Sequence, residues 1–377
     1  MPTIRPNFLP FRALRAPSTS PSTYFSRQIK ITPTVSPVSS VSPKLQPQTQ
    51  FIRNHTTSVS QDEVSHFSSL ASSWWDPMGP SRILHLMNPL RHEFIASCLA
   101  ESSPDTQTST SASASASAST SPPANLHYLD IGCGGGIFAE SLARTIPLDP
   151  SSPAPTPTRA ASMTAIDPTT DLIQIAKKHA RLDPTVDSHL RTGKFRYLNT
   201  TLEDVLASES ESSSTSSSSS SSVSTSNSSV THPQFDIVTL FEVIEHIDPK
   251  TTTYQSFLEK CLSAVKPGGW LIGSTISRTL PSFLLNQVIA EAPWPIGVVP
   301  RGTHEWSKFV NPPELHGWAQ EGLMRLADKG VTRAGAGALD GMMWKCVGAI
   351  YVPGLGWKMV PGSEDWGNYF WAVRRGV

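Results

Sequence analysis

Short apolar runs alternate along this chain with segments in which apolar residues recur every three or four positions. The runs are typical of buried strands, and the segments are typical of helices with one buried face. Alternation of the two kinds favours an α/β fold in which a parallel sheet carries helices on both faces. The predicted strands are 128–131, 163–166, 195–198, 235–240 and 270–275, and the predicted helices are 137–145, 170–181 and 251–265.

The two ends of this pattern add further elements. Residues 344–351 and 368–373 flank a turn rich in Gly and Pro, so they predict a hairpin that completes a mostly parallel sheet of seven strands. Upstream, 62–75 and 82–100 have helical spacing and predict two helices that cap the core.

Three Ser-rich segments contain too few apolar residues to form a core. They are predicted to be disordered, because they bury too little apolar surface to offset chain entropy. The segments are 102–124, 147–161 and 207–231, and each precedes a predicted strand. In a doubly wound sheet the loops that enter strands lie opposite the ligand crevice, so we expect the crevice to survive all three insertions.

The first 61 residues differ in composition from the rest of the chain. They contain seven Lys or Arg residues and no acid, and they are rich in Ser, Thr and Pro. This composition favours an organelle transit peptide, with a disordered basic tail as the alternative. The chain therefore divides into 1–61, a transit peptide and disordered N-terminus; 62–101, the cap helices; 102–124, an insert; and 125–377, the core.

The chain as a whole has 30 basic and 30 acidic residues, so its formal net charge is zero. This balance argues against a broad electrostatic surface for nucleic acid. The four cysteines form no Cys-x-x-Cys pair, which is typical of thiols in a reducing compartment. No apolar run reaches the roughly 18 residues that a membrane-spanning helix requires.

A glycine-rich turn follows the first core strand, in the sequence YLDIGCGGG at 128–136. Glycines at 132, 134 and 136 allow a bound molecule to approach the backbone closely. The dinucleotide fingerprint requires another glycine where this chain has Ile137. The turn therefore favours a nucleoside ligand without a pyrophosphate, such as S-adenosylmethionine.

An acid also follows the second strand. Asp167 lies 35 residues after Gly132, and the insert 147–161 accounts for 15 of them. The remainder is the separation of about 20 expected for an acid that binds ribose hydroxyls through its two carboxylate oxygens. The alternative is an ordinary helix N-cap before Pro168.

The fourth strand leads directly into the sequence E-x-x-E-H. If a helical turn begins at Glu242, then Glu242, Glu245 and His246 project from one face. Two carboxylates and an imidazole at the end of a central strand predict a divalent-metal site, and the carboxylates suit Mg²⁺. The alternative is a polar helix start in which His246 forms a local hydrogen bond.

The glycine turn, Asp167 and the E-x-x-E-H segment together resemble class I S-adenosylmethionine-dependent methyltransferases, which have a Rossmann-like fold. Three further stretches narrow the resemblance: FSSLASSWWD at 67–76, LHLMNPLR at 84–91 and VPRGTHEW at 299–306. With them, the chain is similar to the ubiquinone-biosynthesis O-methyltransferases, which methylate polyprenylated catechols. The resemblance covers 62–377 apart from the three inserts.

This resemblance implies cofactor-binding roles for four residues. Arg91 contacts the methionine carboxylate of S-adenosylmethionine, a bidentate contact that suits a guanidinium. Gly132 lines the cofactor, Asp167 holds the ribose, and Phe241 contributes through its backbone.

The resemblance also implies Mg²⁺ bound by Glu242, Glu245 and His246. The cation binds both catechol oxygens and lowers the pKa of one hydroxyl. The implied reaction is methyl transfer to that oxygen, at both O-methylation steps of ubiquinone biosynthesis. His304 follows a glycine turn and is a candidate general base, with a hydrogen-bonded loop histidine as the alternative.

The implied partners are a polyprenylated catechol substrate, a multi-protein complex for ubiquinone biosynthesis and the matrix side of the mitochondrial inner membrane, with no nucleic acid. Residues 280–299 are apolar, carry only Glu291 as a charge, and include Phe283 and Trp294. They predict a lid that contacts the membrane surface, or a lid that packs on its own core. Of the adjacent tryptophans 74 and 75, we expect one to pack and the other to line the substrate pocket.

Two other functions fit parts of the sequence. An RNA 2′-O-methyltransferase has a similar E-x-x-E-H site, but it needs a basic groove, and the core here is not basic. A non-catalytic scaffold has no physical reason to keep the Gly, Asp and Glu positions intact. Residues 323–343 match the family loosely, so no substrate contact is assigned there.

Overall fold

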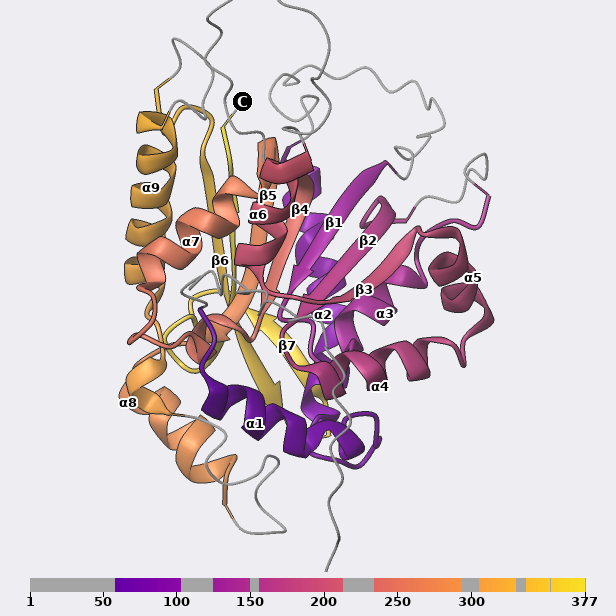
Figure 1. The fold of residues 1–377 in the computed structure, drawn as a ribbon. Helices are drawn as coiled ribbons and strands as arrows, with labels where there is room; N and C mark the ends of the chain where they lie inside the picture. Colours follow the sequence, from indigo (N-terminus) through magenta and orange to yellow (C-terminus); the bar gives the residue numbers. More distant parts are fainter. Residues whose placement is uncertain are drawn as a thin grey trace, which may run out of the picture. The chain divides into compact units, whose positions relative to one another are not determined.

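One mixed sheet forms the centre of the described part of the chain (Figure 1). The computed structural model describes residues 58–102, 125–149, 156–212, 234–292, 305–329, 337–352 and 354–376, except for the side chains of 208–212. They belong to the larger of the two units into which the chain divides, residues 54–377. The described residues do not include 1–57 of the predicted transit peptide or 103–124, 150–155 and 213–231 of the predicted inserts, so the disorder of these segments stays a prediction.

The sheet has eight strands in the order β3-β2-β1-β4-β5-β8-β6-β7. The first five strands of the chain are parallel to one another, and β8 joins them antiparallel to β5. The strands are β1 (Leu126–Ile131), β2 (Ala160–Asp167), β3 (Phe195–Asn199), β4 (Phe235–Phe241), β5 (Val265–Ile276), β6 (Met343–Val352), β7 (Gly356–Val360) and β8 (Asn368–Arg374).

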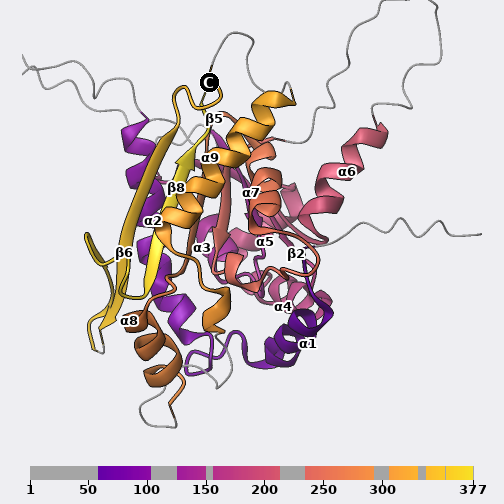
Figure 2. The same ribbon diagram turned by 90° about the vertical axis from the view of Figure 1, so that its left-hand side faces the viewer.

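Helices cover both faces of this sheet. One face packs against α2 to α5, and the other packs against α6, α7 and α9, with α7 and α9 side by side (Figure 2). The helices are α1 (Gln61–Leu70), α2 (Arg82–Glu101), α3 (Ile137–Ala143), α4 (Thr170–Ala180), α5 (Pro184–Thr192), α6 (Leu202–Ser212), α7 (Tyr254–Ser263), α8 (Leu280–Ser282) and α9 (Pro312–Asp328). Three short 3₁₀ turns are η1 (Ala71–Ser73), η3 (Ile244–His246) and η5 (Trp306–Lys308), and a π-helix forms η4 (Phe283–Ile289).

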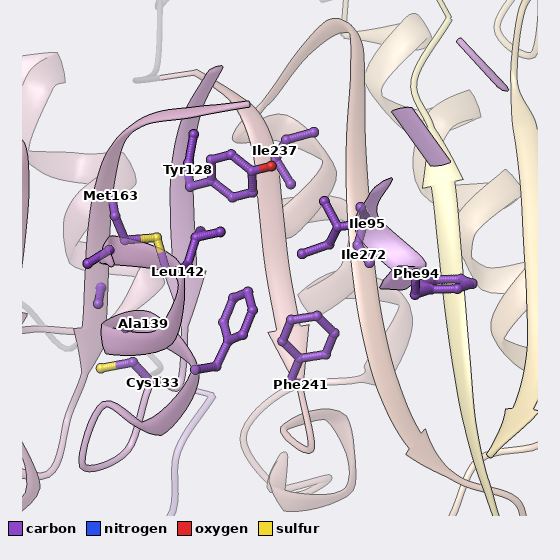
Figure 3. Packing of buried hydrophobic residues seen from close by; sticks show 14 of the residues in the cluster. Phe94, Ile95, Tyr128, Cys133, Ala139, Leu142, Met163, Ile237, Phe241 and Ile272 are labelled. Atoms are coloured by element: carbon purple, nitrogen blue, oxygen red, sulfur yellow. The ribbon is translucent and has the colours of Figure 1, made fainter. Parts of the chain in front are cut away.

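Successive side chains of the central strands point to opposite faces of the sheet and pack in two separate cores. Tyr128 of β1 is buried in the core below α2 and α3, whereas its neighbour Leu129 is buried in the core below α7 and α9. Figure 3 shows the first of these cores, where Phe94 and Ile95 of α2 pack near Ile272 of β5. Burial on both faces accounts for the apolar character of the central strands.

The predicted fold class and all seven predicted strands are confirmed, but the strand count is one too low. The eighth strand, β7, lies inside the Gly/Pro-rich segment that we predicted to be only a turn. The hairpin partners β6 and β8 do pair antiparallel, as expected. The helices α5, α6 and α9 were not predicted.

The boundaries of two predicted inserts also differ from the structure. Strand β2 begins at Ala160, inside the segment 147–161, and helix α6 continues to Ser212, inside 207–231. Ala160 is fully buried, so the end of the first segment contributes to the core despite its small side chains.

The connectivity places the predicted site residues together. Because β1, β2 and β4 are parallel, their carboxyl ends, which lead to Gly132, Asp167 and Glu242, lie at one edge of the sheet. The three inserts join the opposite, amino ends of the same strands, as predicted. Helices α1 and α8 lie at the edge that carries the site, the lower end of the molecule in Figures 1 and 2.

No helix in the described ranges is both long enough and apolar enough to cross a membrane.

Candidate functional site

A cavity of about 470 Å³ opens at the carboxyl edge of the parallel strands. Its size falls within the range typical of pockets that bind small molecules. The predicted cofactor residues and the predicted metal ligands all line this one cavity: Arg91, Gly132, Asp167, Phe241, Glu242, Glu245 and His246. The fold therefore gathers every predicted site residue that the structure describes.

The glycine-rich turn is held by the end of β2. The amides of Gly132 and Cys133 both donate to the Ile166 carbonyl, at 2.9 and 3.0 Å, and the Gly134 amide donates to Oδ2 of Asp167 at 2.9 Å. Gly132, Gly134 and Gly136 have φ values of 69°, 54° and 88°, in the left-handed region that favours glycine.

The glycines of this turn also admit close protein neighbours. A Cβ on Gly132 would lie 2.7 Å from Val243, and a Cβ on Gly134 would lie 2.7 Å from the Trp74 ring. The same ring lies against Gly135. The absence of side chains in the turn is therefore required by packing as well as by a ligand.

The adjacent tryptophans divide their roles, as expected. Trp74 lies over the turn and lines the cavity, whereas Trp75 donates from Nε1 to the Gly135 carbonyl at 2.9 Å and stacks on His179. Trp75 is thus the packing anchor, and Trp74 is the cavity wall.

The carboxylate of Asp167 accepts hydrogen bonds from two backbone amides. Its Oδ1 accepts from the Thr169 amide at 2.8 Å, which resembles the helix-start alternative, while Oδ2 holds Gly134. Burial raises the pKa of Asp167, opposed by these backbone hydrogen bonds. Each carboxylate oxygen has a second lone pair, so the residue can still accept from a ribose hydroxyl.

Arg91 is buried in the cavity wall with an incomplete set of partners. Its Nη1 donates to Asn88 Oδ1 at 3.0 Å, but its Nε has no hydrogen-bond partner in the structure. A buried, unpaired donor on a charged group is costly, so this guanidinium fits an anionic ligand such as a carboxylate. Burial lowers the pKa of Arg91, and nearby Glu242 and Asp130 oppose that shift.

Phe241 acts through its ring in this structure. The Arg91 guanidinium lies 5.0 Å from the ring centroid, and Phe138 packs edge-on against the same ring at 4.6 Å. Its side chain therefore helps to support Arg91 in addition to any backbone contact.

Asp130 belongs to the site but was not among the predicted binding residues. It lines the cavity, and its Oδ1 accepts from the Thr239 hydroxyl at 2.6 Å. Burial raises the pKa of Asp130 to about 7, against the effects of Thr239 and Arg91. The sequence did show an acid at the end of the first strand, and its proximity to Arg91 became visible only in the fold.

The E-x-x-E-H segment does not begin as a helical turn. Glu242 has a φ of 55°, a strained value for a residue with a side chain, and its amide donates to the Ser274 carbonyl at 3.0 Å. Only Ile244–His246 form a helical turn, the 3₁₀ turn η3. The expected arrangement on one helical face is therefore wrong, because β5 holds Glu242 in a different conformation.

Each of the three predicted metal ligands has its own protein partner. Glu242 accepts from Ser274 Oγ at 2.6 Å and from Asn368 at 3.3 Å. Glu245 accepts from Thr275 Oγ1 at 2.8 Å, and His246 Nδ1 lies 3.2 Å from Glu63.

In this arrangement the three residues do not fit a metal site. In the described ranges, no group of three or more His, Cys, Asp or Glu side chains is placed to hold a metal ion. The ligand role of these residues stays a prediction. Burial raises the pKa of Glu245, and the neighbouring charge of Glu242 raises it further.

Glu63 of α1 was missed by the sequence analysis. It lines the cavity and pairs with both His246 and Lys308. Burial raises the pKa of Glu63, but hydrogen bonds and charges from these two residues outweigh it and lower the pKa to about 2. No local pattern signals a partner 183 residues away.

Two other predicted residues fall outside the described ranges. They are His304, the candidate general base, and Trp294 of the predicted lid. The described part of that lid, up to residue 292, contributes Leu285 and Ile289 to the cavity wall.

Comparison with known proteins gives consistent matches. A family model described as a methyltransferase domain matches residues 108–322. The mitochondrial ubiquinone biosynthesis O-methyltransferase of Candida albicans is 31% identical and covers 85% of this chain and 86% of its own. The corresponding protein of Schizosaccharomyces pombe is 35% identical, and the match covers 71% of this chain and 73% of that protein. The ubiquinone biosynthesis O-methyltransferase of Methylobacterium nodulans is 31% identical, and the match covers 85% of this chain and 97% of that protein.

Solved structures are more distant. One is an S-adenosylmethionine-dependent methyltransferase from Thermotoga maritima, 14% identical, with a TM-score of 0.41 over 83% of this chain and 99% of that chain.

The packing of Trp74 on the glycine turn is tested by Gly135→Ala. The new methyl group would overlap the indole ring, so we expect a loss of about 1–3 kcal/mol in the free energy of unfolding. The matched control is Gly317→Ala in α9, where an added Cβ meets no atom within 4 Å. That change should stabilise the helix by about 0.5–1 kcal/mol. Urea unfolding measures both, and equal stability of the two variants would contradict the packing.

Proposed function

Because this chain belongs to the family of ubiquinone biosynthesis O-methyltransferases, we propose that it transfers the methyl group of S-adenosylmethionine to a hydroxyl of a polyprenylated catechol. One observation carries the proposal. A single cavity joins the glycine turn and Arg91 to an acidic end formed by Glu242 and Glu245. A methyl donor and a hydroxyl acceptor bound at these two places would lie next to each other.

We propose that Arg91 binds the methionine carboxylate of the cofactor and that Asp167 binds its ribose. Gly132 and Phe241 would contact the part of the cofactor that lies between these two groups. The unpaired Nε of Arg91 supports the first assignment. Asp130, which lines the same wall, is suited to the positively charged amino group of methionine. Arg91 and Asp130 together would then recognise both charges of an amino acid.

The role of Arg91 is tested by Arg91→Lys. Lysine keeps the charge but lacks the planar fork of donors, so the affinity for S-adenosylhomocysteine should fall about tenfold. The affinity for methylthioadenosine, which lacks the amino-acid part, should change less than about twofold, because it makes no contact with residue 91. Calorimetry measures both ligands. Arg144→Lys is the control, since Arg144 pairs with Asp183 outside the cavity. Equal losses for the two ligands would contradict the assignment.

The proposed reaction is an in-line transfer. The bond between the sulfonium sulfur and the methyl carbon breaks as the bond from the catechol oxygen forms, and the hydroxyl proton must leave. Glu242 and Glu245 lie where a carboxylate can accept that proton. Arg91 and Asp167 hold the donor in place, so much of the acceleration comes from orientation.

The family resemblance predicts Mg²⁺ at the acidic end, and the present arrangement of Glu242, Glu245 and His246 does not support it. When bound, the cation would polarise the catechol oxygens. The acidic end itself is tested by the double variant Glu242→Ala/Glu245→Ala with a short-tail dihydroxybenzoate. Turnover should fall at least a hundredfold while cofactor affinity stays within about threefold.

The same assay separates a metal role from proton acceptance by the acids. Loss of turnover of the unaltered chain in a chelator, restored by Mg²⁺, would establish the cation. Full turnover in the chelator would exclude it and leave the carboxylates as proton acceptors. Unchanged turnover of the double variant would contradict both roles.

We propose a mitochondrial location, since the relatives from Candida albicans and Schizosaccharomyces pombe are described as mitochondrial. The finer predictions are action at both O-methylation steps, membership of a multi-protein complex and attachment to the matrix side of the inner membrane. The described part of the lid supports the last of these. Leu284 and Val288 of η4 are about half exposed, next to the cavity-lining Leu285 and Ile289.

Membrane attachment through this apolar surface is tested by Leu284→Ser/Val288→Ser. The double variant should sediment several-fold less with liposomes that contain anionic lipid, because it loses apolar area at the interface. The matched control is Leu148→Ser/Leu182→Ser, which changes two leucines away from η4 that are even more exposed. A similar loss in both double variants, or no loss in either, would remove η4 as the contact.

A further inference from the structure

Helix α1 forms one wall of the cavity, and its apolar side chains are only partly buried there, with Phe67 and Leu70 packed against the cluster around Trp74. Val64 and Phe67 line the cavity, but no residue of the helix is fully buried. With ten residues, the helix is also shorter than the roughly 12–15 that an isolated helix needs to be even marginally stable in water. Its position therefore depends on specific contacts with the rest of the protein.

The most connected of these contacts is a charged group centred on Glu63. Its Oε2 lies 3.2 Å from His246 Nδ1, and its Oε1 accepts from Lys308 Nζ at 2.9 Å. The exposed fractions of the three side chains are 17%, 24% and 26%, so solvent screens these interactions only in part. Glu63 thus joins α1 to η3 and η5 at once.

The contact fixes the orientation of the His246 ring. Nδ1 faces Glu63, and Phe67 of α1 packs edge-on against the same ring at 4.9 Å. The other ring nitrogen, Nε2, is left for a ligand of the cavity that His246 lines. A carboxylate that binds one nitrogen of a functional histidine fixes both its tautomer and its direction.

We propose that Glu63 is a positioning residue, which reaches from α1 to hold the His246 imidazole in its working orientation at the acceptor end of the cavity. This role rests on the proposed function, because it requires that the acceptor binds beside His246. It makes docking of α1 and completion of the site a single event.

One ion pair of this charged group, between Lys308 and Glu63, holds α1 without contacting His246. Lys308 pairs with Glu63 and with Glu305, at 2.9 and 3.1 Å. Lys308→Gln therefore loosens α1 but leaves Glu63 beside His246. This difference separates positioning from simple anchoring of the helix.

The experiment compares Glu63→Ala, Glu63→Gln, Lys308→Gln and Asp62→Ala in the full chain. Asp62→Ala is the matched control, because it removes an exposed acid from the same helical turn. We expect Glu63→Ala to lower kcat ten- to a hundredfold, about the effect of losing the outer partner of a functional histidine. Glu63→Gln, which keeps an acceptor oxygen, should recover part of that loss, and Asp62→Ala should match the unaltered chain.

Two further measurements separate the causes. Calorimetry should show S-adenosylhomocysteine affinity unchanged in all four variants, and hydrogen exchange should show α1 amides exchanging faster in both Glu63→Ala and Lys308→Gln. If the α1 amides exchange at similar rates in these two variants, kcat should still be at least threefold lower in Glu63→Ala than in Lys308→Gln. The reason is that Glu63→Ala removes the partner of His246, whereas Lys308→Gln does not.

Equal losses of kcat in Glu63→Ala and Lys308→Gln would overturn the positioning role, as would an unaffected Glu63→Ala. Absence of turnover by the unaltered chain with a short-tail dihydroxybenzoate would remove the proposed function itself. Turnover of the unaltered chain together with an unaffected Glu63→Ala would remove only the role of Glu63.

Discussion

The site depends on the few hydrogen bonds that tie the glycine-rich turn to the end of β2. Two amides of the turn donate to the Ile166 carbonyl, and a third donates to the Asp167 carboxylate. The turn and the acid that follows β2 therefore occupy fixed positions relative to each other. Trp74 then covers the turn, and its ring defines how much space remains above it. Displacement of these amides would change the shape of the cavity and the position of Asp167 together.

Much of the fold follows from the sequence because a buried parallel sheet produces a clear pattern. Each predicted strand corresponds to an observed one, and the central strands β1, β4 and β5 have apolar runs that are buried on both faces of the sheet. The missed helix α5 is short, whereas α9 buries Leu315, Ala319, Leu323 and Leu326 at helical spacing, a pattern that the sequence analysis overlooked. Both starts are also marked by a cap followed by proline, at Asp183-Pro184 and Asn311-Pro312.

The site could be predicted in part. Arg91, Gly132 and Asp167 line one cavity, as the family resemblance implies. The conformation of Glu242 could not be predicted, because it is imposed by a hydrogen bond to Ser274, 32 residues later in the chain. Glu63 was missed for a similar reason, since its partners come from η3 and η5. Local patterns identify residues near strand ends, whereas contacts between distant segments decide their geometry.

The distribution of connections around the sheet has a practical consequence. The segments that precede β1, β2 and β4 enter at the amino ends of these strands, and the cavity lies at the carboxyl ends. Chain length can change at that remote edge without altering the walls that contact a ligand. The same three junctions are thus suited to the grafting of an affinity handle or a fluorescent reporter, which would leave α1 and η4 unobstructed at the other end of the molecule.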